Sequence, residues 1–223
     1  MKRIFRHIVI FGLIIFGLCS CSEDNDFVYP NLITELGEMR TDKNGNIQTL
    51  AIDNGATFNI QNNDKYSGLI KDSLYRVLAS YVQVEGGSNQ IEIKSIRLAV
   101  SSFPIKRNLL KNVETDPVEL QSIWTSGNYL NVYVISKVKE IPHVYRFVED
   151  SITSSNGYKT LHLTLLHQRN NDIEGYNRTV YLSVPLYPYQ QSFTRQDSVS
   201  FSLNTYQKGV IKRTFPFPIS NNY

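Results

Sequence analysis

Apolar and polar residues alternate along most of the chain after residue 30, and this period of two predicts β-strands. In the first half the alternation is clear at 75–81, and 47–52 is an apolar-rich run. In the second half it is clearest at 129–134, and it recurs at 161–165, 180–184 and 199–203. Such strands bury one face and expose the other. No helical periodicity of any length follows residue 116, so we expect an all-β fold.

Turn signals divide the first half into short strands. Asn44-Gly45 lies between two apolar-rich runs, and it is typical of a tight hairpin in which both residues take a positive φ. Asp53-Asn54-Gly55 marks the next turn. Near Ser95 the apolar positions change parity, which predicts a β-bulge. Five short strands with one bulge in residues 31–105 predict a small OB-like β-barrel.

The second half has longer strands separated by turns that contain glycine. These turns are expected near 126–128, 156–157 and 174–175. A polar linker over 106–116 ends at Asp116-Pro117, so we expect an antiparallel β-sandwich over residues 116–219.

The N-terminus has the pattern of a lipoprotein signal peptide over residues 1–20. A basic start precedes an apolar run, 8–18, that is too short for a comfortable membrane span. Leu18-Cys19-Ser20-Cys21 resembles the bacterial lipobox, which implies cleavage before Cys21 and acylation of that residue. Two or three acyl chains would hold the protein to a membrane through its N-terminus.

Residues 21–30 are expected to form a solvated acidic tether. The tract 22–26 reads Ser-Glu-Asp-Asn-Asp and resembles the surface-export signal of Bacteroides-type lipoproteins. This resemblance implies a lipid-anchored protein of the outer membrane, exposed at the cell surface. Attachment at the periplasmic face is the alternative.

Charge and cysteine content argue against nucleic-acid binding and against sites built from cysteine. The chain carries a net charge of +3, for which Lys2, Arg3 and Arg6 of the signal peptide account, so the mature chain is near neutral. A near-neutral chain without a basic face is not expected to bind nucleic acid. Apart from Cys21, the mature chain has no cysteine, which excludes disulfides and thiolate metal sites.

Candidate chemistry is sparse, and we predict no catalytic residue, metal or cofactor. His162 and His167 lie on opposite faces of one predicted strand and His143 is in another segment, so we expect water-facing histidines and no metal site. Asp172 and Glu174 share a parity beside a glycine, where a solvated turn is expected. An envelope hydrolase is therefore the less favoured interpretation.

Aromatic residues provide two further candidates. Tyr187 and Tyr189 flank a proline and could stack on a sugar ring, or they could cover a sandwich edge. Trp124 is expected in the sandwich core rather than at a ligand site.

Three serines follow an aspartate and precede an apolar residue: Ser73, Ser151 and Ser198. The tripeptide resembles the Bacteroides O-glycosylation motif, and each copy is expected at the start of a strand. We therefore predict these serines as possible modification sites.

The order of these parts resembles the NigD-like lipoproteins. The resemblance rests on the Asn44-Gly45 and Asp53-Asn54-Gly55 turns, on 122–131 with its Trp-to-Leu-Asn stretch, and on 163–172. It implies an OB-like domain followed by a β-sandwich, and a bacteriocin-immunity role has been suggested for the family. It supplies no catalytic residues. We therefore expect a non-enzymatic envelope protein that binds a toxin-like protein, with a glycan as the alternative partner.

Overall fold

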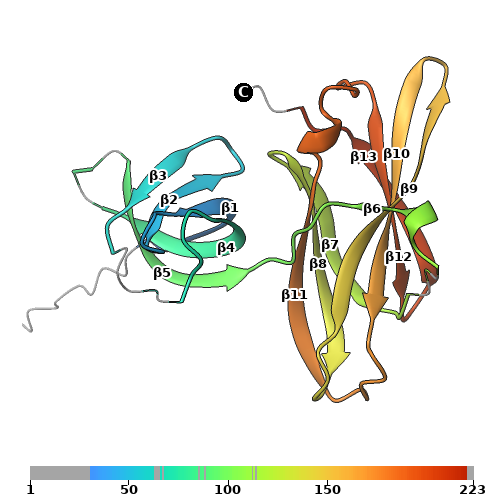
Figure 1. Ribbon diagram of the computed structural model, residues 1–223, viewed down its shortest axis with the longest axis horizontal. Helices are drawn as coiled ribbons and strands as arrows, with labels where there is room; N and C mark the ends of the chain where they lie inside the picture. Colours follow the sequence, from blue (N-terminus) through green and yellow to red (C-terminus); the bar gives the residue numbers. More distant parts are fainter. Residues whose placement is uncertain are drawn as a thin grey trace, which may run out of the picture. The chain divides into compact units, whose positions relative to one another are not determined.

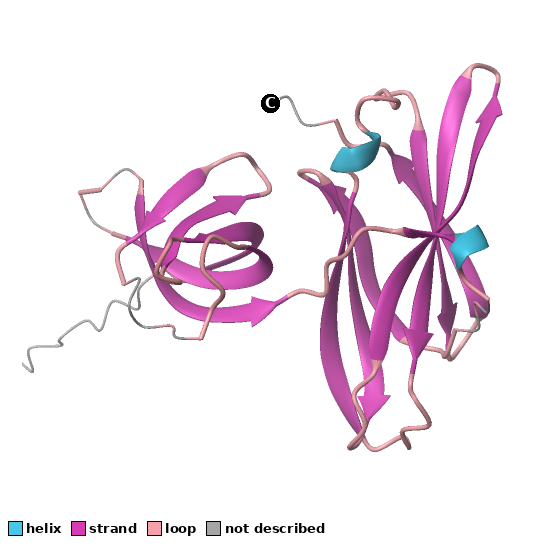
Figure 2. Ribbon diagram, in the orientation of Figure 1, coloured by secondary structure: helices cyan, strands magenta, loops and turns pink. Residues whose placement is uncertain are grey.

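The computed structural model describes residues 31–62, 66, 68–84, 86–87, 89–111, 113 and 115–219. The predicted signal peptide, Cys21 and the acidic tether lie outside the described residues. Within the described part of the chain, no helix is long and apolar enough to cross a membrane. Among the described residues strands dominate, and Figure 2 also shows short helical turns.

The first five strands close into a barrel. Their order is β1-β2-β3-β5-β4, and all neighbours are antiparallel except β3 and β5. This arrangement, visible in Figure 1, confirms the OB-like barrel. The strands are β1 (Ile33–Thr41), β2 (Ile47–Ile52), β3 (Thr57–Ile60), β4 (Leu74–Gln83) and β5 (Gln90–Leu98).

The predicted bulge lies in β5. Ser80 of β4 pairs with Ser95 and Tyr81 pairs with Ile93, so Lys94 is the extra residue. The slip lets Ile93 enter the barrel core, where it is fully buried. Tyr81 is also buried there, and its hydroxyl donates to Glu35. The change of apolar parity in the sequence therefore identified the bulge correctly.

The β1–β2 turn differs from the tight hairpin that we predicted. Thr41 pairs with Ile47, and the Asp42 carboxylate accepts hydrogen bonds from the backbone N–H of Asn44 and of Asn46. Gly45 has a φ of +86°, whereas Asn44 is not among the residues with positive φ. A Cβ at Gly45 would lie 2.8 Å from the carbonyl oxygen of Leu69. The turn is therefore wider than predicted, because the Asp42 side chain closes it.

The second half forms two sheets that pack into the predicted sandwich. One sheet has the order β13-β12-β10-β9-β6 and the other β11-β8-β7. Most pairs are antiparallel, while β10–β12 and β6–β9 are parallel. The strands are β6 (Ile105–Lys106), β7 (Glu119–Ser126), β8 (Tyr129–Val138), β9 (Val144–Ser155), β10 (Tyr158–Gln168), β11 (Tyr176–Pro185), β12 (Ser198–Thr205) and β13 (Gly209–Pro216). The helical turns are η2 (Arg107–Leu109) and η3 (Tyr187–Tyr189).

Trp124 is not a core residue, contrary to our expectation. The β7–β8 register shifts between Leu120 and Ser122, so that Leu120 and Ile123 pack against the sandwich core. Trp124 pairs with Asn131 and shares its face, which is the opposite one. Simple alternation along β7 could not reveal which parity faces inward after this irregularity.

Arg76 of β4 connects the barrel to the sandwich. Its side chain is only 2% exposed, and its guanidinium donates to both carboxylate oxygens of Asp53, at 2.6 and 2.7 Å. It also donates to Asn131 and Ser183 of the sandwich, each at 3.1 Å. The guanidinium carbon lies 3.9 Å from the ring centre of Tyr129. The buried charge of Arg76 is thus paired within the barrel by Asp53, and its remaining hydrogen bonds reach neutral groups of the sandwich.

Backbone pairing with the sandwich begins at Val100, which bridges to Leu182. The domain limits at 105 and 116 stay predictions.

Candidate functional site

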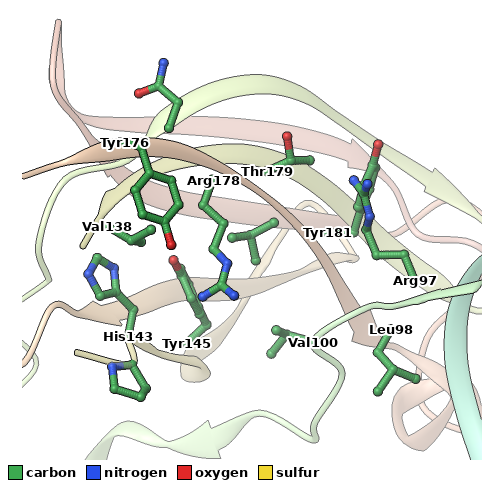
Figure 3. Close-up of a pocket in the computed structure, with 13 residues that line it drawn as sticks. Arg97, Leu98, Val100, Val138, His143, Tyr145, Tyr176, Arg178, Thr179 and Tyr181 are labelled. Atoms are coloured by element: carbon green, nitrogen blue, oxygen red, sulfur yellow. The ribbon is translucent and has the colours of Figure 1, made fainter. Parts of the chain in front are cut away.

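A cavity of about 650 Å³ runs along β11 (Figure 3). Its volume is within the range typical of ligand pockets, roughly 300–1,000 Å³. The wall comprises residues 176–181 of β11 together with Arg97, Leu98, Val100, Val138, Pro142, His143 and Tyr145.

The backbone edge of β11 is part of this cavity. β11 is the outer strand of its sheet, and Val100 pairs with only one end of it. The Val100 N–H donates to Tyr181 O at 2.8 Å, and the Ser183 N–H donates to Val100 O at 2.9 Å. Because edge-facing groups alternate along an antiparallel strand, the N–H and C=O of Asn177 and Thr179 face the same edge. No described strand pairs with them there.

Two arginines give the cavity a positive charge. Arg97 and Arg178 are exposed, and no carboxylate lines the cavity. Within the described residues, neither arginine forms an ion pair. Figure 3 shows the Arg178 guanidinium close to the hydroxyl end of Tyr145, while Arg97 lies beside Tyr181. Unpaired guanidinium groups in a recess attract anions.

His143 lines one end of the cavity and contacts His167 behind it, and both rings are shielded from water, contrary to the expectation of water-facing rings. The His143 side chain is 2% exposed, and its Nδ1 lies 2.9 Å from Nε2 of His167. His167 is fully buried and stacks on Tyr145 with 4.7 Å between ring centres. The chain near Asp116 hydrogen-bonds to this end of β10, where Leu165, Leu166 and His167 are all buried. Alternation along one strand does not reveal such a long-range cover.

Further contacts hold both rings of this pair in place. His167 Nδ1 lies 3.1 Å from Asp116 O, and His143 Nε2 lies 3.3 Å from Asp172 Oδ2. The carbonyl and the carboxylate are acceptors, so the ring nitrogens are the donors in these two contacts. Burial lowers the pKa of His167 to about 4, so this ring is neutral at pH 7.

Asp172 is a structural residue rather than part of a solvated turn. It is 5% exposed and accepts the backbone N–H groups of Lys139 and Glu140, at 2.7 and 3.1 Å. The Lys139 N–H is the main cause that lowers the pKa of this carboxyl, and the His143 contact acts in the same direction. Glu174 is exposed and pairs with Lys137, as a solvated position would. Within the described residues, no group of His, Cys, Asp and Glu is arranged to hold a metal ion.

Tyr187 and Tyr189 do not converge on a common site. The Tyr189 hydroxyl donates to Glu149 at 2.7 Å. Tyr187 packs edge-on against Phe103 and Tyr129. Their contact with a ligand stays a prediction.

The three candidate serines have different surroundings. Ser73 precedes β4 and is half-buried, and Ser198 begins β12 after the buried Asp197. Ser151 is exposed and lies well inside β9, not at its start. Their modification stays a prediction, with Ser151 the most accessible of the three.

Sequence analysis did not find the main residues of the cavity. Tyr176 and Arg178 share a parity with the buried Leu182 and with Val180, which packs against the core. An arginine on the core-facing side of a strand was the signal that could have identified this cavity.

Comparisons with known proteins agree with the fold. A NigD-like immunity protein from Bacteroides caccae matches 85% of this chain and 99% of its own, at 27% identity and a TM-score of 0.68. A Parabacteroides distasonis protein, provisionally described as toxin-related, matches 83% of this chain and 92% of its own, at 15% identity and a TM-score of 0.60. A Bacteroides fragilis protein, provisionally described as a lipoprotein, matches 85% of this chain and 100% of its own, at 12% identity and a TM-score of 0.57. The last two show the fold alone.

The sequence comparisons identify the family. None of the curated proteins matches the chain. A family model described as the NigD-like C-terminal beta sandwich domain matches residues 101–217, which is more than half of the chain. The chain therefore belongs to the NigD-like family.

Proposed function

We propose that this protein is a non-enzymatic, lipid-anchored protein of the outer membrane that binds a toxin-like protein and protects the cell that carries it. The observation that carries this proposal is the open edge of β11 beside two unpaired arginines. A strand edge of this kind can accept a segment of another protein.

The surroundings of the cavity support binding rather than catalysis. Within the described residues, the ring nitrogens of His143 and His167 are engaged with each other, with Asp116 O and with Asp172. A general base needs a nitrogen that can reach the reacting proton. These rings are instead held by protein groups, so they are suited to a structural role.

The family and the lipobox resemblance support the envelope location. A relative from Bacteroides caccae is described as an immunity protein, and a Bacteroides fragilis protein of the same fold is provisionally described as a lipoprotein. Acylation at Cys21 would concentrate the protein at the membrane where a toxin arrives.

Gene deletion followed by co-culture tests this proposal. Cells that lack the gene are mixed with neighbouring strains of the same community, and survivors are counted. We expect the deletion strain to be killed by at least one toxin-producing neighbour, and the wild-type gene to restore resistance. A Cys21→Ser form, matched in abundance, should protect less. Unchanged sensitivity of the deletion strain in all co-cultures would contradict the proposal.

A glycan is the second candidate ligand, and one observation favours it. Trp124 and Tyr181 line a cavity of about 420 Å³ together with Glu35, Asp53 and Asn54. Aromatic faces beside a few oriented polar groups are suited to a sugar ring. Polysaccharide affinity electrophoresis tests this alternative, with Trp124→Ala beside the Tyr187→Ala/Tyr189→Ala pair. A sugar site at this cavity predicts lost retention in the Trp124→Ala variant alone.

A further inference from the structure

We propose that the open edge of β11 binds an extended acidic peptide segment, which pairs with the strand and places carboxylates at Arg97 and Arg178. The inference rests on the proposed binding function and names the chemistry of the partner at that site.

The backbone of β11 supplies the first part of the argument. The N–H and C=O groups of Asn177 and Thr179 face the edge that Val100 occupies further along the strand. Val100 pairs there in a parallel direction, so this edge already accepts one extended segment. An added strand would continue the same ladder over the part that no described strand covers.

The side chains on both faces of β11 supply the second part. In Figure 3, Tyr176 and Arg178 point towards Tyr145, whereas Thr179 and Tyr181 lie on the other side of the strand, with Arg97. The side chains of an added strand would also alternate between the two faces. One set would meet Arg178, and the other would meet Arg97.

Charge selects an acidic segment. Arg97 and Arg178 have no carboxylate partner among the described residues. Arginine binds carboxylates through paired hydrogen bonds, which are stronger than those between neutral groups. The same charges disfavour pairing between two copies of this edge, because arginine would then face arginine. The edge is thus protected from self-association and open to an acidic segment.

Peptide binding to the full chain in non-ionic detergent tests this inference. The probe is a fluorescein-labelled hexapeptide of alternating Glu and Val, blocked at both ends and followed by fluorescence anisotropy. We expect it to bind at least tenfold more tightly than a Lys-Val peptide of the same length. A Glu-Val peptide with alternate backbone N-methyl groups, which cannot complete the ladder, should bind at least tenfold more weakly.

Three variants separate charge from backbone pairing. Arg178→Gln should weaken binding about tenfold, and Thr179→Pro should do the same because it removes an edge-facing N–H. Proline at this position leaves the β8 ladder intact, since the lost donor faces away from β8. Arg146→Gln is the matched control, because Arg146 is an exposed residue of β9 outside the cavity. If Thr179→Pro unfolds the sandwich, Arg178→Gln still tests the role of charge and the N-methyl peptide still tests backbone pairing.

Hydrogen exchange measured by mass spectrometry should show slower exchange across 176–181 when the Glu-Val peptide is bound. Equal binding of the Lys-Val peptide, or unchanged binding to Arg178→Gln, would overturn the inference. Either result would leave the co-culture experiment as an independent test of the proposed function.

Discussion

Arg76 and Arg178 are the same side chain in opposite environments. Arg76 is buried and bonded to Asp53, Asn131 and Ser183. Arg178 is exposed on an edge strand, with no carboxylate partner among the described residues. The first arrangement satisfies a charge inside the protein, and the second leaves a charge available to a partner. The presence of a carboxylate partner thus distinguishes the structural Arg76 from the candidate binding residue Arg178.

The largest expected effect comes from removing the partner of Arg76. Asp53→Ala leaves a buried guanidinium without its carboxylate, and we expect the free energy of unfolding to fall by about 3–5 kcal/mol. Urea unfolding measures the change. An Asp53→Ala/Arg76→Met double variant should recover part of the loss, because it removes the unpaired charge. A loss below about 1 kcal/mol in the single variant would mean that the pair is well solvated, contrary to its burial.

The next effect concerns the buried histidines beside the Arg178 cavity. His167 titrates near pH 4 in the folded protein, against about 6.5 in an unfolded chain. The unfolded chain therefore binds more protons between these values, and stability should fall as the pH falls from about 6.5 to 4. The expected loss is on the order of 2 kcal/mol.

Urea unfolding at several pH values checks this dependence in the wild type and in His167→Gln. The variant should be less stable at pH 7 and should show a flatter profile in this window. Parallel profiles for the two proteins would argue against a buried neutral ring at position 167.

The smallest effect is expected at the other arginine. Arg178→Gln should change the free energy of unfolding by no more than about 0.5 kcal/mol, because an exposed, unpaired side chain stabilises little. Thermal unfolding of this variant beside Asp53→Ala makes the comparison direct. A large loss of stability in Arg178→Gln would show that the residue is structural, and the contrast with Arg76 would fail.

The sequence predicted local features well, since they depend on neighbouring residues. Alternation identified β4 in the first half and β8, β10, β11 and β12 in the second, and the parity change near Ser95 located the bulge at Lys94. The Asn44-Gly45 signal found a turn but not its width, because the Asp42 carboxylate closes it. Side-chain bonding of this kind competes with the standard turn types.

The candidate site depended on contacts between distant segments, which one sequence does not reveal. Arg76 bonds Ser183 across 107 positions, and His167 is covered by the chain near Asp116. Trp124 was expected in the core because large aromatic residues are usually buried, but the register shift in β7 leaves it on the opposite face. Each of these features follows from which strands become neighbours, and strand order is a property of the whole fold.

The bridge between Val100 and Leu182 limits the length of any strand that can pair with the β11 edge. The chain's own backbone occupies the positions opposite Leu182, so an incoming strand has room only as far as Thr179 and Val180. A longer guest would have to displace this connection, which joins the last barrel strand to the sandwich. The length of the bound segment would then decide whether it only pairs with β11 or also displaces the connection between the barrel and the sandwich.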